Sequence, residues 1–118
     1  MSAFVQYVVV RRDLLHVLKW PTGAVIAQAC HACTAVLHQF RDDENVHLYT
    51  SQLESMHKVV LEAQNEDSLR TLSTELTASH IDHTLWIEQP ENIATCIAAK
   101  PYPKEQVQKH FKKFKLFK

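Results

Sequence analysis

Near its start the chain carries FVQYVVV, residues 4–10, and this stretch decides the class of fold. It is rich in β-branched residues and almost continuously apolar. A strand with one face in water alternates apolar and polar side chains, whereas a strand covered on both faces reads as a continuous apolar run. We therefore expect residues 4–10 to form a strand that is covered on both faces.

A long helix is predicted after this strand. Pro21 suits the first helical position, and the segment 20–23 is a poor helix interior. Apolar side chains then recur at helical spacing, namely Ile26, Cys30, Cys33, Leu37 and Phe40. We expect this stripe to pack on the core.

Two shorter helical patterns follow. Residues 42–55 predict a short helix with three inward side chains, Val46, Tyr49 and Leu53. Asn65 can cap the next helix, where Glu66 and Asp67 suit the first turn. The buried stripe expected for this helix is Leu69, Leu72 and Leu76.

The strand patterns predict a mixed sheet. Besides residues 4–10, strands are expected at 58–61, 83–88 and 94–99, and five residues that include Pro90 join the last two as a hairpin. Strands separated by helices imply parallel crossovers, whereas a hairpin forces an antiparallel pair. We therefore predict one α/β domain over residues 1–118, with a mixed four-stranded sheet flanked by helices in the order β-α-α-β-α-β-β-α.

Positive charge is concentrated at the C-terminal end of the chain. The sequence from residue 100 onward has seven lysines against Glu105 alone, although the whole chain is neutral. One interpretation is a solvated helix that packs Val107, Phe111 and Phe114 inward. The other is a docking surface for RNA phosphates or an acidic partner, and both interpretations are compatible.

Composition excludes several classes of protein. A chain with one glycine cannot contain a Walker loop, a Rossmann glycine pattern or a Gly-x-Ser-x-Gly elbow. No apolar run approaches the roughly 20 residues that span a bilayer, so we expect no membrane association. Three cysteines make an odd count, which favours a reducing, cytoplasmic setting.

The long predicted helix also carries a candidate site. Gln28 and His31 lie beside small residues such as Ala24, so a low-volume surface surrounds one amide and one imidazole. His31 could act with a carboxylate, Glu88 or Asp13, as a general base that deprotonates a water for attack on an ester. The alternative is a partly buried histidine that hydrogen-bonds to the backbone.

Two further features have competing interpretations. Lys58 opens a short apolar strand, and it is either an oxyanion-stabilising group or a strand-edge lysine in water. The set Cys30, Cys33, His31 and His38 suggests a metal site, but on a helix the cysteines and the histidines point to different faces. We therefore expect neither metal nor cofactor.

Four segments stand in a characteristic order: VRRDL at 10–14, the run from Gly23 to His31, KVVL at 58–61, and a paired-strand region that ends at Lys100. In this order they resemble the second, archaeal and eukaryotic family of peptidyl-tRNA hydrolases, the peptidyl-tRNA hydrolase 2 family. The resemblance covers nearly the whole chain. It is most specific at IEQPENIATCIA, residues 87–98, which is similar to the domain-containing branch of that family.

The resemblance implies a hydrolase that uses activated water to cleave the ester between a peptide, or an N-blocked amino acid, and the 3′-terminal ribose of tRNA. Gln28 and His31 would position substrate or water, Lys58 would be the electrophile, and Glu88 the acidic member. Further predicted substrate contacts are Asp13, Gly23, Asn92 and Thr95. The tRNA would be held by Lys112, Lys113 and Lys115, and a homodimer is compatible with the family.

The chain departs from the family pattern where the family has charged residues. Ala24 replaces a lysine, Glu91 replaces an arginine, and Glu88 replaces an aspartate. The first two changes remove positive charge, and attraction to phosphates supplies much of the affinity for nucleic acids. A noncatalytic descendant that binds RNA or a protein partner is therefore the alternative function.

Overall fold

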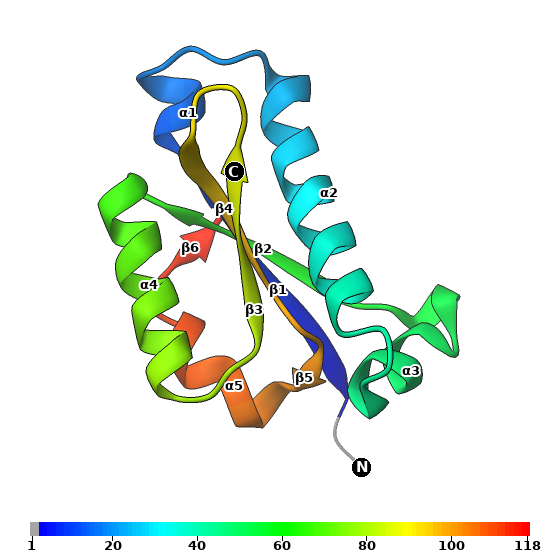
Figure 1. Ribbon diagram of the computed structural model, residues 1–118. Coiled ribbons are helices and arrows are strands. Elements are labelled where there is room, and N and C mark those ends of the chain that lie inside the picture. Colours follow the sequence, from blue (N-terminus) through cyan, green and yellow to red (C-terminus); the bar gives the residue numbers. More distant parts are fainter. Residues whose placement is uncertain (1–2) are drawn as a thin grey trace.

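The central strand β1 (Phe4–Arg11) runs through a mixed sheet in the computed structural model, which describes residues 3–118 (Figure 1). It pairs in parallel with β2 (Lys58–Ala63) and antiparallel with β4 (Ile93–Ala99). On its other side, β4 pairs antiparallel with β3 (His83–Glu88) as the second half of the hairpin. The predicted α/β fold with a mixed sheet is confirmed.

The sheet has six strands rather than the predicted four. The additional strands have two residues each: β5 (Tyr102–Pro103) pairs with β1, and β6 (Lys115–Leu116) pairs with β2. The path through the sheet is β3-β4-β1-β2-β6. Two residues are too few to show an alternating pattern in sequence, so only the folded chain reveals these pairings.

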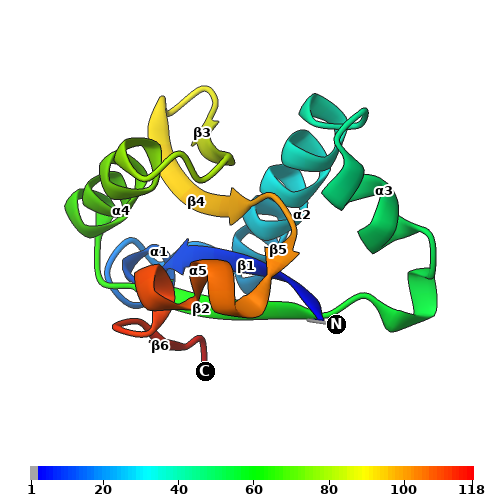
Figure 2. The same cartoon turned by 90° about the horizontal axis from the view of Figure 1, so that it is seen from below.

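Helices cover both faces of the sheet. The long helix α2 (Thr22–Gln39) lies on one face, and α4 (Glu66–Ala78) and α5 (Lys104–Phe111) lie on the other. Figure 2 shows the β3–β4 hairpin passing between α2 and α4. Within β1, Val9 packs into the core under α4 and α5, while Val8 and Val10 pack into the core under α2. This two-sided burial explains why residues 4–10 are continuously apolar.

Helix α4 has the predicted buried stripe and cap. Leu69, Leu72 and Leu76 are completely buried. The Asn65 side chain accepts a hydrogen bond from the Ser68 amide (2.9 Å), which satisfies one of the free N–H groups at the helix start.

The predicted apolar stripe of α2 is wrong for Ile26 and Cys30, whereas Cys33, Leu37 and Phe40 pack against the core as partly buried side chains. Ile26 is 59% exposed and Cys30 is also exposed, whereas the buried side chains of this helix are Val25, Gln28, Ala32 and Val36. The helix is rotated so that Ala32 meets the sheet, where small side chains allow a close approach. Apolar residues occur on more than one side of α2, so periodicity does not specify which side is buried.

Three short helices complete the fold: α1 (Asp13–His16), α3 (Glu44–Thr50) and the 3-10 turn η1 (Leu53–Ser55). The turn α1 was not predicted. In the predicted 42–55 helix, Val46 and Tyr49 are buried as expected, but Leu53 is 63% exposed because α3 ends before it.

The C-terminal segment agrees with the prediction in its first half. Val107 and Phe111 are buried on α5. Phe114 lies after the helix end and is only partly buried, because the chain turns there into β6. Lys112 and Lys113 therefore lie on a turn and Lys115 on a short strand, not on a helix.

Candidate functional site

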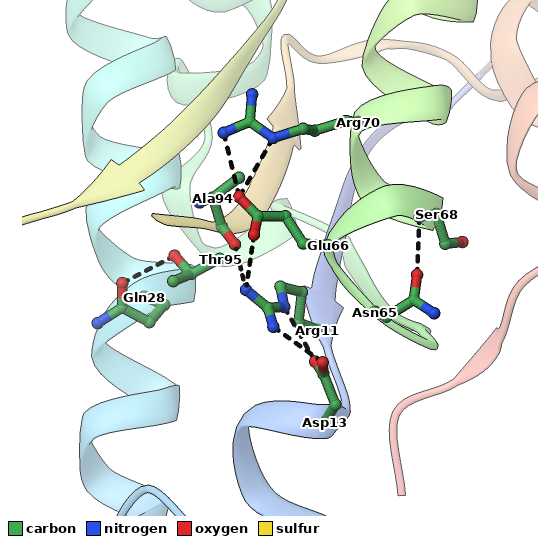
Figure 3. Close-up of polar contacts among 9 residues, drawn as sticks. All are labelled: Arg11, Asp13, Gln28, Asn65, Glu66, Ser68, Arg70, Ala94 and Thr95. Atoms are coloured by element: carbon green, nitrogen blue, oxygen red, sulfur yellow. Dashed lines mark hydrogen bonds and ion pairs between the residues drawn. The ribbon is translucent and has the colours of Figure 1, made fainter. Parts of the chain in front are cut away.

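Polar side chains gather where β1 ends and β4 begins (Figure 3). Arg11, at the last position of β1, has a side chain only 7% exposed and forms a paired contact with Asp13 (Nε to Oδ1, 2.9 Å; Nη2 to Oδ2, 2.8 Å). Its Nη1 also donates to the carbonyl oxygen of Ala94 (3.0 Å). A buried guanidinium with these partners links the turn after β1 to the first residues of β4.

Glu66 adds the start of α4 to the same network. Its carboxylate accepts from the Ala94 amide (3.0 Å) and from Arg70 (3.2 Å), and its other oxygen lies 3.7 Å from Arg11 Nη1. The hydrogen bond from Ala94, together with the Arg70 and Arg11 cations, lowers the pKa of Glu66 despite partial burial. Ala94 is therefore held at both backbone polar groups, by Arg11 and Glu66.

Gln28 and Thr95 join α2 to β4 on the other side of this network (Figure 3). The Thr95 hydroxyl donates to Gln28 Oε1 (2.8 Å), and Gln28 Nε2 donates to the carbonyl oxygen of Ala24 (3.1 Å). Both side chains are almost fully buried. The Gln28 amide is thus oriented by its neighbours in the fold.

Trp86 connects the two titratable side chains of the candidate site. Its indole stacks on His31 with 4.9 Å between ring centroids, and its Nε1 donates to Glu88 Oε1 (3.0 Å). Hydrogen bonds from Trp86 and Gln28, with the nearby His31, hold the pKa of Glu88 below its ordinary value. The structure therefore brings His31, Glu88 and Gln28 together.

This arrangement suits proton transfer. Among residues 3–118, neither ring nitrogen of His31 has a hydrogen-bond partner, and the side chain is exposed. The expected alternative, a histidine bonded to backbone, is not what the structure has. An accessible imidazole near an ionised carboxylate can take a proton from water, and the carboxylate stabilises the imidazolium that forms.

Three other predicted site residues lie near this end of the sheet in different settings. Asp13 is bound to Arg11, so Glu88 is the carboxylate that interacts with His31. Asn92 lies in the hairpin turn with φ 57°, and its amide donates to the Glu88 carbonyl oxygen (2.7 Å). Gly23 lies exposed in the first turn of α2, where an added Cβ would meet nothing within 4 Å.

Lys58 does not join the cluster. Strands β4 and β1 lie between β2, which carries Lys58, and β3, which carries Glu88, so three strand spacings separate them, roughly 14 Å. Its Nζ instead donates to Gln6 Oε1 and lies 5.2 Å from the Tyr49 ring centroid. The position of Lys58 in the sequence does not reveal the order of the strands in the sheet. The sequence analysis therefore could not show that Lys58 lies away from His31.

The three tail lysines separate into two groups. Lys113 and Lys115 line a pocket beside Arg12, whereas Lys112 lines a different groove with Tyr7 and Val59. Lys113 also forms an ion pair with Glu75 (2.9 Å).

Two residues of the site were not singled out from sequence. Trp86 precedes Glu88 by two positions, so alternation along a strand puts both on one face, and this signal was available. Arg11 is a charge at the end of an apolar strand, which is costly to bury unless it is paired. The Arg11 signal needed the end of the strand to be known, because the predicted strand ended at residue 10 and β1 ends at Arg11.

Within residues 3–118, no group of three or more His, Cys, Asp or Glu side chains is arranged to hold a metal ion. In the same part of the chain, no helix combines the length and apolar character needed to cross a membrane.

Comparison with known proteins gives one consistent result. Residues 4–117 match the family profile described as "Peptidyl-tRNA hydrolase PTH2". A mouse (Mus musculus) protein named "Putative peptidyl-tRNA hydrolase PTRHD1" is 57% identical over 115 residues, which is 97% of this chain and 82% of the relative. The human (Homo sapiens) protein of the same name is 56% identical over 118 residues, 99% of this chain and 84% of the relative.

Proposed function

Because the chain belongs to the peptidyl-tRNA hydrolase 2 family, we propose that it hydrolyses the ester between a peptide, or an N-blocked amino acid, and the 3′-terminal ribose of tRNA. The observation that carries the chemistry is the Trp86 indole, which contacts His31 with its face and Glu88 with its N–H.

In the proposed reaction His31 acts as the general base. It takes a proton from a water molecule as the water oxygen attacks the ester carbonyl carbon. Glu88 stabilises the imidazolium that results. When the tetrahedral intermediate collapses, the bond to the ribose oxygen breaks and His31 returns the proton to that oxygen.

The remaining site residues have supporting roles in this proposal. Gln28 and Thr95 are positioning residues, because their mutual hydrogen bond holds α2 on β4 and the Gln28 amide contacts Glu88. Asp13, Gly23 and Asn92 stay predicted substrate contacts at the rim. Lys58 is left out of the chemistry because of its position two strands beyond the hairpin.

The alternative function is a noncatalytic protein of the same family that binds RNA or a protein. The observation in its favour is Ala24, which stands where the family resemblance calls for a lysine. Hydrolysis then lacks the positive group that this lysine would supply to the developing oxyanion.

Single-turnover hydrolysis of a labelled N-acyl-aminoacyl-tRNA separates the two functions. We expect cleavage by the wild type that is lost in His31→Ala and Glu88→Gln and retained in Lys58→Ala, the matched control for a charged residue outside the cluster. His31→Ala should change stability by no more than about 1–2 kcal/mol. Binding of tRNA without any cleavage would favour the noncatalytic function, and full cleavage by His31→Ala would remove His31 from the mechanism.

A cytoplasmic location and a homodimer stay predictions. The three cysteines, which are all unpaired, support a reducing compartment.

A further inference from the structure

A pocket of about 610 Å³ opens between the start of α4, the turn after β1 and the C-terminal segment. Three cationic side chains line it, Arg12, Lys113 and Lys115. None of the site residues with His31 lines this pocket, although Asp13 forms part of its wall.

We propose that this pocket binds one nucleotide of the tRNA substrate, with a phosphate between Arg12 and Lys115 and the base against Phe114. The proposal rests on the proposed function for the identity of the RNA. It adds a second contact on the tRNA, separate from the ester-cleaving site.

The cations have unused hydrogen-bond donors. Arg12 Nη1 donates to Glu62 (2.7 Å) and to the carbonyl oxygen of Lys118 (2.9 Å), while its Nε and Nη2 have no partner among residues 3–118. Lys115 is the sheet partner of Glu62, and in the same part of the chain its Nζ has no partner. Arg12 and Lys115 are therefore two cations beside one carboxylate, with donors free for a phosphate.

The acidic side chains of the wall do not cancel this charge. Asp13 is already neutralised by its paired contact with Arg11, which lies outside the pocket lining. Glu62 interacts with Arg12 and faces Lys115 in the sheet. An anion between Arg12 and Lys115 thus meets a local excess of positive charge.

The rest of the wall suits a nucleoside better than a bare anion. Phe114 provides apolar surface on which a base can stack. Ser68 and Thr71 line the same pocket, and within residues 3–118 neither hydroxyl makes a hydrogen bond. These hydroxyls can bind a ribose, and the volume falls in the range of sites for small ligands.

The pocket and the candidate active site are connected at the end of β1. Asp13 in the pocket wall binds Arg11, and Arg11 binds the carbonyl oxygen of Ala94. The next residue, Thr95, holds Gln28 of the active site (Figure 3). The pocket wall and the candidate active site therefore share a network of contacts at the end of β1.

The chain provides a matched control in Lys109. It has the same charge as Lys115, lies six residues away and is also exposed, but it lines the groove with Tyr7 and Val59. Lys115→Glu and Lys109→Glu change the net charge equally, so different effects of the two variants on binding indicate a localised site.

The first test is the affinity for labelled, deacylated tRNA, measured by fluorescence anisotropy over a range of salt concentrations. We expect Lys115→Glu to weaken binding about five- to tenfold and to lower the salt slope by about one, with less than a twofold effect of Lys109→Glu. Melting curves of both variants check that the fold is kept. Equal effects of the two variants, or no effect of Lys115→Glu, would overturn the proposal.

The second test locates the ligand with AMP as the probe. We expect AMP to shift the backbone amide NMR signals of Ser68 and Thr71, and adenosine to shift them less. If inorganic phosphate shifts these signals as much as AMP does, the pocket does not recognise the nucleoside. If AMP causes no shift, the pocket does not bind a nucleotide and the proposal is wrong. Neither test requires hydrolysis. If the protein binds tRNA and AMP as expected but cleaves no substrate, only the proposed enzyme activity is contradicted.

Discussion

At the scale of single residues, Trp86 contacts the two titratable side chains of the candidate site. Its aromatic face fixes the orientation of His31, and its N–H group binds the Glu88 carboxylate. Tryptophan offers both contacts at once, which phenylalanine cannot do because it lacks the indole donor.

Replacing Trp86 with phenylalanine should therefore separate the two contacts. We expect Trp86→Phe to keep an aromatic ring beside His31 and to raise the pKa of Glu88 toward its ordinary value. The pKa can be followed through the Glu88 carboxyl carbon by NMR. Trp20→Phe is the control, since Trp20 packs on the core under α2, and an unchanged Glu88 pKa in Trp86→Phe would contradict the role of the indole.

Arg11 and Arg12 are neighbours with different environments. The Arg11 side chain is 7% exposed and has several partners, whereas the Arg12 side chain is 35% exposed and pairs with Glu62. Removing a buried partner leaves the Asp13 charge and the Ala94 carbonyl unsatisfied, whereas an exposed ion pair contributes little.

We therefore expect Arg11→Met to lower the free energy of unfolding by about 3 kcal/mol, and Arg12→Met by about 1 kcal/mol or less. Urea denaturation of both variants measures this difference. If the two variants lose equal free energy of unfolding, the contacts of Arg11 stabilise the fold no more than the Arg12–Glu62 ion pair does.

At the scale of elements, the contact of α2 with β4 contains one buried polar pair within an apolar core. Small side chains bring the helix close to the sheet, and Gln28 is satisfied there by Thr95 and by the carbonyl oxygen of Ala24. Buried polar groups are costly when one partner is lost.

Thr95→Val keeps the shape of the side chain and removes the donor to Gln28. We expect it to destabilise the protein by about 1–3 kcal/mol, and Gln28→Leu combined with Thr95→Val to cost less than the sum of the single changes. A double-mutant cycle by thermal or urea unfolding measures the coupling. Additive losses would indicate that the hydrogen bond does not couple α2 to β4.

At the scale of the whole molecule, carboxylates join elements that are distant in the chain. Glu75 on α4 accepts hydrogen bonds from Lys113 and His110, and Asp43 before α3 accepts one from the buried Lys100. The Lys113 and His110 contacts lower the pKa of Glu75, and contacts from Lys100 and Asn45 lower that of Asp43 against the opposing effect of burial.

These shifts determine the sign of the pH dependence. A carboxyl group whose pKa is lower in the folded state stabilises the protein above its unfolded pKa, about 4, and this contribution is lost as pH falls through the folded pKa. We expect the free energy of unfolding to fall below about pH 5, with a flatter curve for Glu75→Gln. Urea titrations from pH 7 to pH 3 test this, and identical curves for the two proteins would contradict it.

The longer elements and their order follow from the sequence, because periodicity, caps and turns are local properties of the chain, whereas α1, β5 and β6 were not predicted. The run at residues 4–10, the leucine stripe of α4 and the hairpin pattern each predicted the element that the structure has, although the hairpin loop has four residues, 89–92, rather than the predicted five. The family resemblance also arises at this level, since it depends on residues in order along the chain.

The tertiary structure alone decided which side chains meet. The strand order keeps Lys58 away from Glu88, the rotation of α2 buries Gln28 and exposes Ile26, and the pairing of β6 brings Lys115 beside Arg12. Each of these outcomes depends on pairing and packing between segments far apart in the chain. Local sequence patterns do not report contacts between distant segments. The sequence therefore predicted the longer elements, whereas the packing of these elements determined which side chains lie together at the site.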